Sequence, residues 1–391
     1  MALADRWLLP EGVKEILPPE AGQIEAMRRR LLDLFDSWGY ELVLPPLMEH
    51  LDALLTGVGG ELDLNTFKLT DQLSGHALGV RADITPQVAR IDAHRMRNEG
   101  PSRLCYCGSV LHTRSTQPLA SRNPLQIGAE LFGHSGLDSD VEVIALMVTT
   151  LKSAGTCQEL SLDLGHVGIF RGLMKDAGLS AAQQTEYQSM LQRKALPEVD
   201  QFLQTLALEP KMHSYLEALP RLHGGTEVLA KAKMLFAAGQ EDVLQAVAYL
   251  EELATRVKKR FPQLDLYFDL SELRGYNYHT GVVFAAYTPV YGQAIAKGGR
   301  YDDIGRDFGR ARPATGFSAD LKTLSDIAGR QVSQSSQVFA PAGEDAALLA
   351  KIDELRAQGV RVVQSLSGMD QAVKSGTELV LINGEWTLKG L

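Results

Sequence analysis

The chain has little cysteine, which excludes the classes of protein that depend on it. Cys105, Cys107 and Cys157 are the only cysteines among 391 residues, and none of them has the Cys-x-x-Cys spacing of zinc or redox sites. A disulfide scaffold needs paired cysteines and an oxidising compartment. We therefore predict reduced thiols in the core and no metal site.

Long apolar runs and a secretory start are also missing. A membrane-spanning helix needs about 20 consecutive apolar residues, and the longest apolar runs fall far short of that. The N-terminal sequence MALADRWLLPEG does not combine a basic start with an apolar stretch, as a signal peptide does. These absences predict a cytoplasmic protein that does not enter a membrane.

Clustered basic residues are scarce. The formal net charge is −9, and the longest basic run is Arg28-Arg29-Arg30. Binding to a nucleic-acid backbone favours clustered Lys and Arg, because each contact releases counterions. We therefore predict no nucleic-acid partner. What the chain does have, 45% hydrophobic and 22% charged residues, is typical of a globular protein with a large core and two or three domains.

A predicted hairpin at Leu104–Gly133 carries the most distinctive polar pattern. Its second half alternates polar or small residues with apolar ones, which is the period of a half-buried strand. Residues 104–113 suit the partner strand, and residues 114–123, with a proline and serines, suit the loop. Gln126 and Glu130 then share one face of the sheet. A solvated face is the ordinary interpretation, and a ligand pocket is the alternative.

The elements before this hairpin follow from periodicity and capping. Pro18-Pro19 opens a predicted helix with one apolar stripe, formed by Ile24, Met27, Leu31, Leu34, Phe35 and Trp38. A strand is expected at Tyr40–Leu44, and a short hairpin at Phe67–Leu69 and Ala77–Val80. Thr85 suits the N-cap of the next helix.

The middle of the chain is predicted to be almost wholly helical. A helix is expected at Asp138–Ser153, and residues 168–261 then carry successive helical patterns. Strand patterns at Glu159–Gly165 and Leu264–Leu270 flank these helices. We therefore expect an all-α insertion between two parts of one sheet, and we assign it no chemistry.

Polar blocks near the end of the first domain combine glycine with charged and aromatic residues. Leu273–Gly281 contains Arg274-Gly-Tyr-Asn-Tyr-His, and Ala296–Asp302 contains Gly-Gly-Arg-Tyr-Asp. Paired glycines allow close approach of a ligand to the backbone, but Gly-Gly is also a common hairpin turn. A third block lies at Pro313–Leu324.

Together these segments resemble the class II aminoacyl-tRNA synthetases, and among them histidyl-tRNA synthetase. The first helix and strand resemble motif 1, which forms the dimer interface in that class. The hairpin at Leu104–Gly133 resembles motif 2, and Pro313–Leu324 resembles motif 3. The resemblance covers Leu9–Ala328. It implies an α+β fold, in which helices flank a mostly antiparallel sheet, with a helical insertion and a small C-terminal α/β domain.

The same resemblance implies a histidine pocket. Its residues would be Asp83, Thr85, Gln126, Glu130, Arg274, Tyr278 and His279. Asp83 and Thr85 match positions that hold the substrate's ammonium group in the family. Arg274 matches an arginine beside the substrate carboxylate and phosphate. His279 departs from the family, which has a second tyrosine in its place.

The positions that hold ATP in the synthetases are changed. Leu111 replaces the motif 2 arginine that contacts the α-phosphate, and Thr323 replaces the motif 3 arginine. Neither side chain offers the charged, planar fork of Arg. Asp320 adds an acid where the phosphates would lie. The resemblance therefore implies a synthetase-like protein without catalytic residues.

This combination resembles the regulatory subunits of ATP phosphoribosyltransferase, the first enzyme of histidine biosynthesis. The resemblance implies a noncatalytic homodimer that activates a short-form catalytic subunit within a hetero-octamer and helps mediate histidine feedback. No cofactor is expected, and histidine is a possible effector. One alternative is an active histidyl-tRNA synthetase or an amino-acid-activating paralogue. Another is a histidine sensor for an unrelated partner.

The predicted domain organisation has a large and a small part. Residues 1–328 form the synthetase-like domain, with the helical insertion at about 168–261 inside it. Residues 329–337 read as a polar linker. Residues 338–391 alternate strand and helix patterns and resemble a truncated anticodon-binding domain. A helix is expected there at 369–375, between two strand patterns.

Overall fold

A computed structural model describes most of the chain. It covers residues 7–56, 60–115, 121–156, 159–237, 240–276, 278–329, 337–368 and 376–390. The chain divides into two compact units, Met1–Arg330 and Gln331–Leu391, which are described separately. Most of the predicted linker at 329–337 lies outside the described residues, as do Cys157 and the predicted helix at 369–375.

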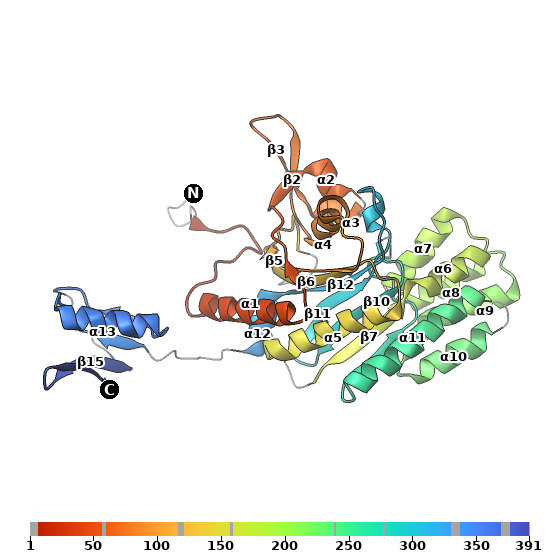
Figure 1. Cartoon of the computed structure of the whole chain (residues 1–391). Helices are drawn as coiled ribbons and strands as arrows, with labels where there is room; N and C mark the ends of the chain where they lie inside the picture. Colours follow the sequence, from red (N-terminus) through yellow and green to blue (C-terminus); the bar gives the residue numbers. More distant parts are fainter. Residues whose placement is uncertain are drawn as a thin grey trace. The chain divides into compact units, whose positions relative to one another are not determined.

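A nine-stranded sheet forms the centre of the first unit, with strand order β1-β5-β6-β12-β11-β10-β7-β9-β8 (Figure 1). Its strands are β1 (Glu41–Leu42), β5 (Ser102–Ser109), β6 (Leu125–Phe132), β7 (Ser161–His166), β8 (His223–Gly224), β9 (Asp265–Asp269), β10 (Val282–Thr288), β11 (Tyr291–Arg300) and β12 (Ala314–Asp320). Only the β1–β5 and β7–β9 pairs are parallel. The predicted, mostly antiparallel sheet is confirmed.

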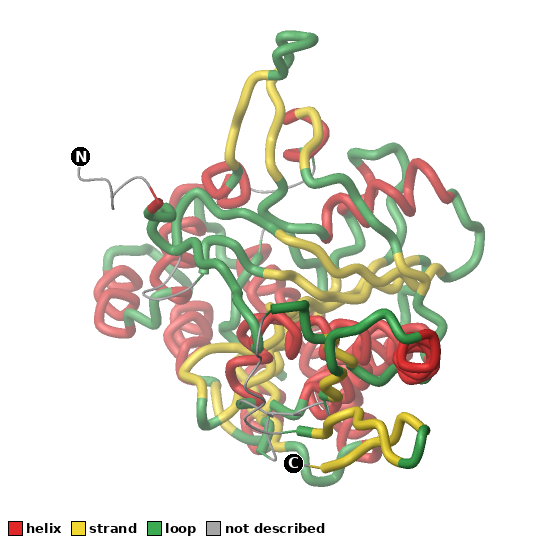
Figure 2. The backbone as a smooth tube through the Cα atoms, turned by 90° about the vertical axis from the view of Figure 1, so that its left-hand side faces the viewer, coloured by secondary structure: helices red, strands yellow, loops and turns green. Residues whose placement is uncertain are grey.

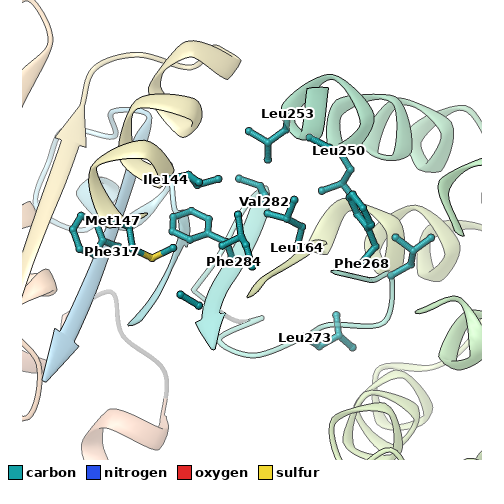
Figure 3. Packing of buried hydrophobic residues seen from close by; sticks show 14 of the residues in the cluster. Ile144, Met147, Leu164, Leu250, Leu253, Phe268, Leu273, Val282, Phe284 and Phe317 are labelled. Atoms are coloured by element: carbon teal, nitrogen blue, oxygen red, sulfur yellow. The ribbon is translucent and has the colours of Figure 1, made fainter. Parts of the chain in front are cut away.

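Helices bury one face of this sheet. They are α1 (Glu20–Ser37), α5 (Leu137–Ala154) and α12 (Leu321–Ala328). The predicted stripe of α1 is buried at Ile24, Met27, Leu31 and Phe35. Figure 3 shows how Ile144 and Met147 of α5 approach Phe284 and Phe317 of the sheet. The opposite face of the sheet is left to carry polar groups.

A smaller sheet stands beside the large one, with strand order β2-β4-β3. Its elements are β2 (Met48–His50), α2 (Leu51–Leu55), α3 (Gly60–Asn65), β3 (Phe67–Thr70), β4 (Ala77–Val80), α4 (Thr85–Arg90) and the π-helix η2 (Ile91–Met96). The predicted β3–β4 hairpin is confirmed and projects from the unit in Figures 1 and 2. Thr85 is not an N-cap: Ile84 holds that position, and the Thr85 hydroxyl bonds elsewhere.

The insertion between β7 and β9 is helical, as predicted. It contains α6 (Val167–Asp176), α7 (Ala181–Gln192), α8 (Leu196–Gln204), α9 (Pro210–Ala218), the 3-10 turn η3 (Leu219–Arg221), α10 (Glu227–Phe236) and α11 (Glu241–Arg260). Strand β8 is its one strand among the described residues. Leu250 and Leu253 of α11 pack over Leu164 and Phe268, which extends the core beneath the sheet (Figure 3).

The second unit is a small α/β domain. Its sheet has the order β14-β13-β15-β16. The elements are β13 (Val338–Ala340), α13 (Ala346–Ala357), β14 (Val362–Gln364), β15 (Thr377–Ile382) and β16 (Glu385–Gly390). Leu348, Ile352 and Leu355 of α13 form its core with the sheet. Asp345 caps α13 by accepting from the Leu348 N–H at 2.9 Å.

The described cysteines are thiols rather than disulfides. Cys105 is buried and Cys107 partly buried, and both are free. Burial raises the pKa of Cys105 to about 12 and that of Cys107 to about 11, so both remain protonated at neutral pH. In the part of the chain that the structure describes, no group of His, Cys, Asp and Glu is arranged to hold a metal ion. No described helix is long and apolar enough to cross a membrane.

Candidate functional site

The β5–β6 hairpin places Glu130 on the face of the large sheet that α1 and α5 do not cover. Glu130 lies opposite Leu104 of β5 and Gly316 of β12 in the strand register. The predicted alternation of β6 is therefore correct. The solvated-face interpretation is wrong, because Glu130 is only 1% exposed. Groups from α4, β5 and the end of β11 cover it.

Hydroxyl groups surround the Glu130 carboxyl. Thr85 Oγ1 donates to Oε1 at 3.1 Å, Tyr106 Oη donates to Oε1 at 3.0 Å, and Tyr301 Oη donates to Oε2. Burial raises the pKa of Glu130 to about 8, and these donors only partly oppose that effect. Glu130 is therefore largely protonated at neutral pH. A cation that reached it would favour its ionised form.

Gln126 holds the segment before α4 against β6, beside Glu130. Its Nε2 donates to Asp83 Oδ1 at 2.8 Å, and its Oε1 accepts from the Ile84 N–H at 2.9 Å. Asp83 Oδ1 also accepts from the Thr85 N–H at 2.9 Å. The start of α4 is thus tied to β6, and this tie directs the Thr85 hydroxyl toward Glu130.

Tyr278 and His279 complete the cluster from the other side. The Tyr278 ring stacks on Tyr301 with 4.9 Å between ring centroids, and His279 meets Tyr278 edge-on at 5.4 Å. The Tyr278 hydroxyl is buried and has no hydrogen-bond partner among the described residues. Such a group costs about 1–3 kcal/mol unless a ligand or water pairs with it.

His279 is held as a neutral acceptor. Its Nδ1 lies 3.3 Å from the Arg274 carbonyl and 3.2 Å from the Gly275 carbonyl, so Nδ1 must donate. Desolvation lowers the pKa of His279 to about 4. Its Nε2, which lies over Gly299, is therefore a hydrogen-bond acceptor at neutral pH.

The side chain of Arg274 pairs with a residue outside the predicted pocket, although its carbonyl lies 3.3 Å from His279 Nδ1. Its Nε and Nη2 donate to Glu272 Oε2 at 3.0 and 2.6 Å, and its guanidinium lies over the Tyr287 ring of β10. Hydrogen bonds join Asp83, Thr85, Gln126 and Glu130 directly. Tyr278 and His279 contact each other and are linked to Glu130 through Tyr301. Sequence reasoning missed Tyr106 and Tyr301 as members. Tyr301 could have been found, since it follows Gly-Gly-Arg in the second block.

Gly298 and Gly299 do not form the hairpin turn that was one interpretation of this block. Both lie inside β11, opposite Phe317 and Gly316 of β12. A Cβ at Gly299 would come within 2.5 Å of the His279 ring. Glycine is therefore needed there for close packing rather than for a turn.

Arg171 of the helical insertion holds the loop that carries Tyr278 and His279. Its Nη2 donates to the His279 carbonyl at 2.7 Å and to the Tyr276 carbonyl at 3.4 Å, and its Nη1 donates to the Thr280 carbonyl at 3.4 Å. Gln192 Nε2 donates to the Leu273 carbonyl at 3.0 Å, at the other end of the loop. The insertion thus fixes the backbone of the loop.

A buried ion pair fixes the end of β11, directly before Tyr301. Arg300 Nη2 donates to Asp140 Oδ1 at 3.0 Å and to Ser139 Oγ at 2.7 Å. Tyr249 of α11 also donates to Asp140. Breaking one partner of a buried pair is strongly destabilising, so we regard Arg300 as a structural residue behind the pocket.

The residues at the positions that match the ATP site of the synthetases form hydrogen bonds with other residues of this chain. Thr323 Oγ1 donates to Asp320 Oδ2 at 2.9 Å, and Asp320 Oδ1 accepts from the Leu125 N–H at 3.0 Å. Lys322 Nζ donates to the Asn123 carbonyl. Leu111 is half-buried, and its N–H donates to the Arg81 carbonyl at 3.1 Å.

Comparisons first define the class of the large unit. A family model described as histidyl-tRNA synthetase matches residues 12–324. A histidyl-tRNA synthetase from a Nostoc species has the same fold, with a TM-score of 0.79 over 98% of this chain and 94% of that one at 19% identity. An ATP phosphoribosyltransferase regulatory subunit/histidyl-tRNA synthetase from Bacillus halodurans has a TM-score of 0.82 at 27% identity, covering 93% of this chain and 94% of that one. The fold is that of a class II synthetase.

The particular family follows from closer relatives. A model described as the ATP phosphoribosyltransferase subunit HisZ C-terminal domain matches residues 335–389. The ATP phosphoribosyltransferase regulatory subunit of Alkalilimnicola ehrlichii is 57% identical over 93% of this chain and 91% of its own length. That of Thioalkalivibrio sulfidiphilus is 53% identical over 100% of both chains. The chain belongs to the family of ATP phosphoribosyltransferase regulatory subunits.

Proposed function

We propose that this chain is a noncatalytic regulatory subunit that activates a short-form catalytic subunit of ATP phosphoribosyltransferase and binds histidine as the feedback signal. One observation carries the proposal. The half of the sheet face around Glu130 offers an acid, hydroxyls and a neutral imidazole acceptor. In the half around Asp320, the carboxylate is instead hydrogen-bonded to Leu125 and Thr323 of the same chain. The first half suits an amino acid, and the second does not suit a triphosphate.

The chemistry of the second half explains why amino-acid activation is not expected. Transfer of an adenylyl group needs fixed positive charge on the phosphate oxygens, and removing one such contact typically lowers the rate by about 10²–10³. Leu111 has no donor in its side chain. Thr323 donates to Asp320, whose carboxylate would repel phosphate.

The chemistry of the first half suits histidine. Imidazole and ammonium groups donate hydrogen bonds, and the pocket offers acceptors at Glu130 and at His279 Nε2. Asp83 is a further acid on this face: it accepts from Gln126, which lies four residues before Glu130 on β6. Hydrogen bonds that involve a charged group are worth about 1.5–3 kcal/mol each.

Exposed apolar side chains support a homodimer within the proposed complex. Near the edge strand β1, Leu42 is 49% exposed, Leu44 is 78% exposed and Met48 is 52% exposed. An exposed apolar patch commonly marks a protein interface. This region matches motif 1, which forms the dimer interface in class II synthetases. A hetero-octamer with the catalytic subunit and a cytoplasmic location are further parts of the proposal.

The test is reconstitution with a short-form catalytic subunit. The mixture should form phosphoribosyl-ATP faster than the catalytic subunit alone, and histidine should inhibit it. The complex should elute as one species whose mass matches a hetero-octamer. A chain that leaves the catalytic subunit unchanged, yet responds to histidine in a thermal shift assay, would instead favour a sensor for an unrelated partner.

A further inference from the structure

We propose that strand β16 of the small α/β domain pairs antiparallel with β16 of a second copy of this chain, about a two-fold axis at Thr387. This contact belongs to the unit Gln331–Leu391 and is separate from the dimer surface proposed near β1. It does not depend on the proposed histidine pocket. A two-fold contact uses the same surface on both copies, so the strand must be complementary to itself.

The two edges of the small sheet differ in length. Strand β14 has three residues, Val362–Gln364, whereas β16 has six, Glu385–Gly390. β16 contains no proline, and its register with β15 is unbroken along its whole length. Among the residues that the structure describes, no strand pairs with the outer side of β16. A long, regular edge presents N–H and C=O groups that can pair with a strand of another chain.

The turn before β16 determines which of its backbone groups face outward. The two residues of the Asn383-Gly384 turn have φ of 51° and 86°, as in the type I′ turn of a two-residue hairpin. Glu385 follows this turn directly, so it belongs to the hydrogen-bonded pair that closes the turn. Hydrogen-bonded and non-hydrogen-bonded pairs alternate along an antiparallel ladder. The backbone groups of Trp386 and Leu388 therefore point away from β15.

A two-fold axis at Thr387 brings these outward groups together. Trp386 then lies opposite Leu388 of the second copy, and the axis repeats this pair. Both members offer an outward N–H and an outward C=O, so each pair can exchange two hydrogen bonds. An axis between two residues would instead set an outward group against an inward one. The alternation therefore restricts the axis to a residue position.

The charges of the strand favour the axis at Thr387 over its neighbours. Glu385 and Lys389 lie two residues on either side of Thr387, so each glutamate lies opposite the lysine of the other copy. Both side chains are exposed. Opposite charges directly across an antiparallel pair are stabilising, and like charges are destabilising. An axis at Trp386 or Leu388 would lose both of these charge pairs.

Apolar side chains on the α13 side of β16 also favour the contact. Leu388 lies opposite Leu379 in the register, and both share this side of the sheet with the next pair, Leu381 and Trp386. Leu379 is buried in the core with α13, but Leu381 is 57% and Leu388 is 50% exposed. A second β16 would place its tryptophan beside Leu388, and this would cover apolar surface that α13 leaves open.

Cysteine cross-linking of the full-length chain tests this contact. Thr387→Cys would place two thiols opposite each other in a non-hydrogen-bonded pair, with Cα atoms about 4.5 Å apart. A disulfide can form at that separation. With copper–phenanthroline as oxidant, Thr387→Cys should give a disulfide-linked dimer. Asp353→Cys, at an exposed position of α13, is the matched control and should not. The wild type measures the background from its own cysteines.

Charge reversal tests the register. When it is added to Thr387→Cys, Glu385→Lys sets like charges across both pairs and should slow cross-linking by about 10-fold. Adding Lys389→Glu as well restores opposite charges and should restore the rate. Lys389→Glu without Glu385→Lys should slow cross-linking equally, so it replaces Glu385→Lys if that variant does not fold. Circular dichroism and thermal unfolding would show that each variant keeps the wild-type fold.

Two results would overturn the proposal. If Thr387→Cys cross-links no faster than Asp353→Cys, then β16 does not pair with a second copy. In that case, protection of the introduced thiol from a maleimide by the catalytic subunit would assign the edge to that partner instead. If Thr387→Cys cross-links but neither charge reversal slows it, then the two copies do not meet in this register. Neither result bears on histidine binding or on activation of the catalytic subunit.

Discussion

Two halves of the same sheet face differ in how their polar groups are paired. Around Glu130, groups from distant segments converge on one buried acid, and the buried Tyr278 hydroxyl has no partner among the residues that the structure describes. Around Asp320, each polar group that we describe is used within the chain: Asp320 accepts from Leu125 and Thr323, and Lys322 donates to Asn123. Under the proposed function, one half of the face binds a ligand and its neighbour has a structural role.

The largest effect expected from this contrast concerns ATP chemistry. The isolated chain should show no histidine-dependent ATP–pyrophosphate exchange, and Leu111→Arg should not restore it, because Asp320 and Thr323 remain. Exchange would be measured with labelled pyrophosphate beside an authentic histidyl-tRNA synthetase. Exchange at about a hundredth of the synthetase rate, within the loss expected for one missing charge contact, would show that the Asp320 half still holds nucleotide.

The second prediction concerns a substitution that weakens histidine binding at Glu130. In the complex with the catalytic subunit, Glu130→Gln should raise the histidine concentration needed for half inhibition by about 10- to 150-fold, because a charged hydrogen bond is lost. Activation of the catalytic subunit should survive. Glu186→Gln, at an exposed position of α7, is the control. Unchanged inhibition would place the inhibitory histidine at the subunit interface or on the catalytic chain.

The third prediction concerns the pH dependence of stability. Burial raises the pKa of Glu130 from 4.5 to about 8, so the folded state holds a proton that the unfolded state loses between these values. Stability that Glu130 contributes is therefore lost as pH rises toward 8. Between pH 6.5 and 8 the wild type should lose up to about 2 kcal/mol relative to Glu130→Gln.

Urea denaturation of both proteins at pH 6.5 and 8 would measure this difference. The window avoids most of the titration of His166 and His279, whose pKa values burial lowers to about 4 and which act in the opposite direction below pH 6.5. Parallel pH profiles for the two proteins would mean that Glu130 is already ionised in the folded state.

The smallest effect concerns the cap at Asp320. Asp320→Ala removes the acceptor of the Lys322 N–H at the start of α12 and leaves the Leu125 N–H without its partner. The free energy of unfolding should fall by about 1–2 kcal/mol. Asp320→Asn keeps the acceptor and should cost less. A loss below about 0.5 kcal/mol for Asp320→Ala would show that the Asp320 half is not held by these bonds.

The sequence allowed prediction of what depends on local periodicity. The β5–β6 hairpin, the stripe of α1 and the helical insertion were all predictable from spacing alone. The shared face of Gln126 and Glu130 was predictable too, but not its burial. The cover comes from Thr85 and Tyr301, which are 45 and 171 residues away from Glu130 in sequence. Spacing within one strand carries no information about such distant groups.

Predictions from the family resemblance and predictions from local patterns were wrong at different residues. Matching to a family pattern suggested Asp83 and Thr85, which the structure joins to β6. The same matching could not foresee that Arg274 pairs with Glu272, because that contact depends on the conformation of the intervening turn. The N-cap expected at Thr85 was wrong because its hydroxyl bonds to a buried acid instead.

Arg171 donates hydrogen bonds to three backbone carbonyls, and these bonds limit which parts of the protein can be removed. Excising the helical insertion would delete the donor to the backbone of residues 276, 279 and 280 at once. The loop that carries Tyr278 and His279 would lose its anchor, and the large sheet would also lose strand β8 and the cover of α11. A smaller scaffold for the proposed histidine pocket must therefore keep α6, even though none of its residues was assigned any chemistry.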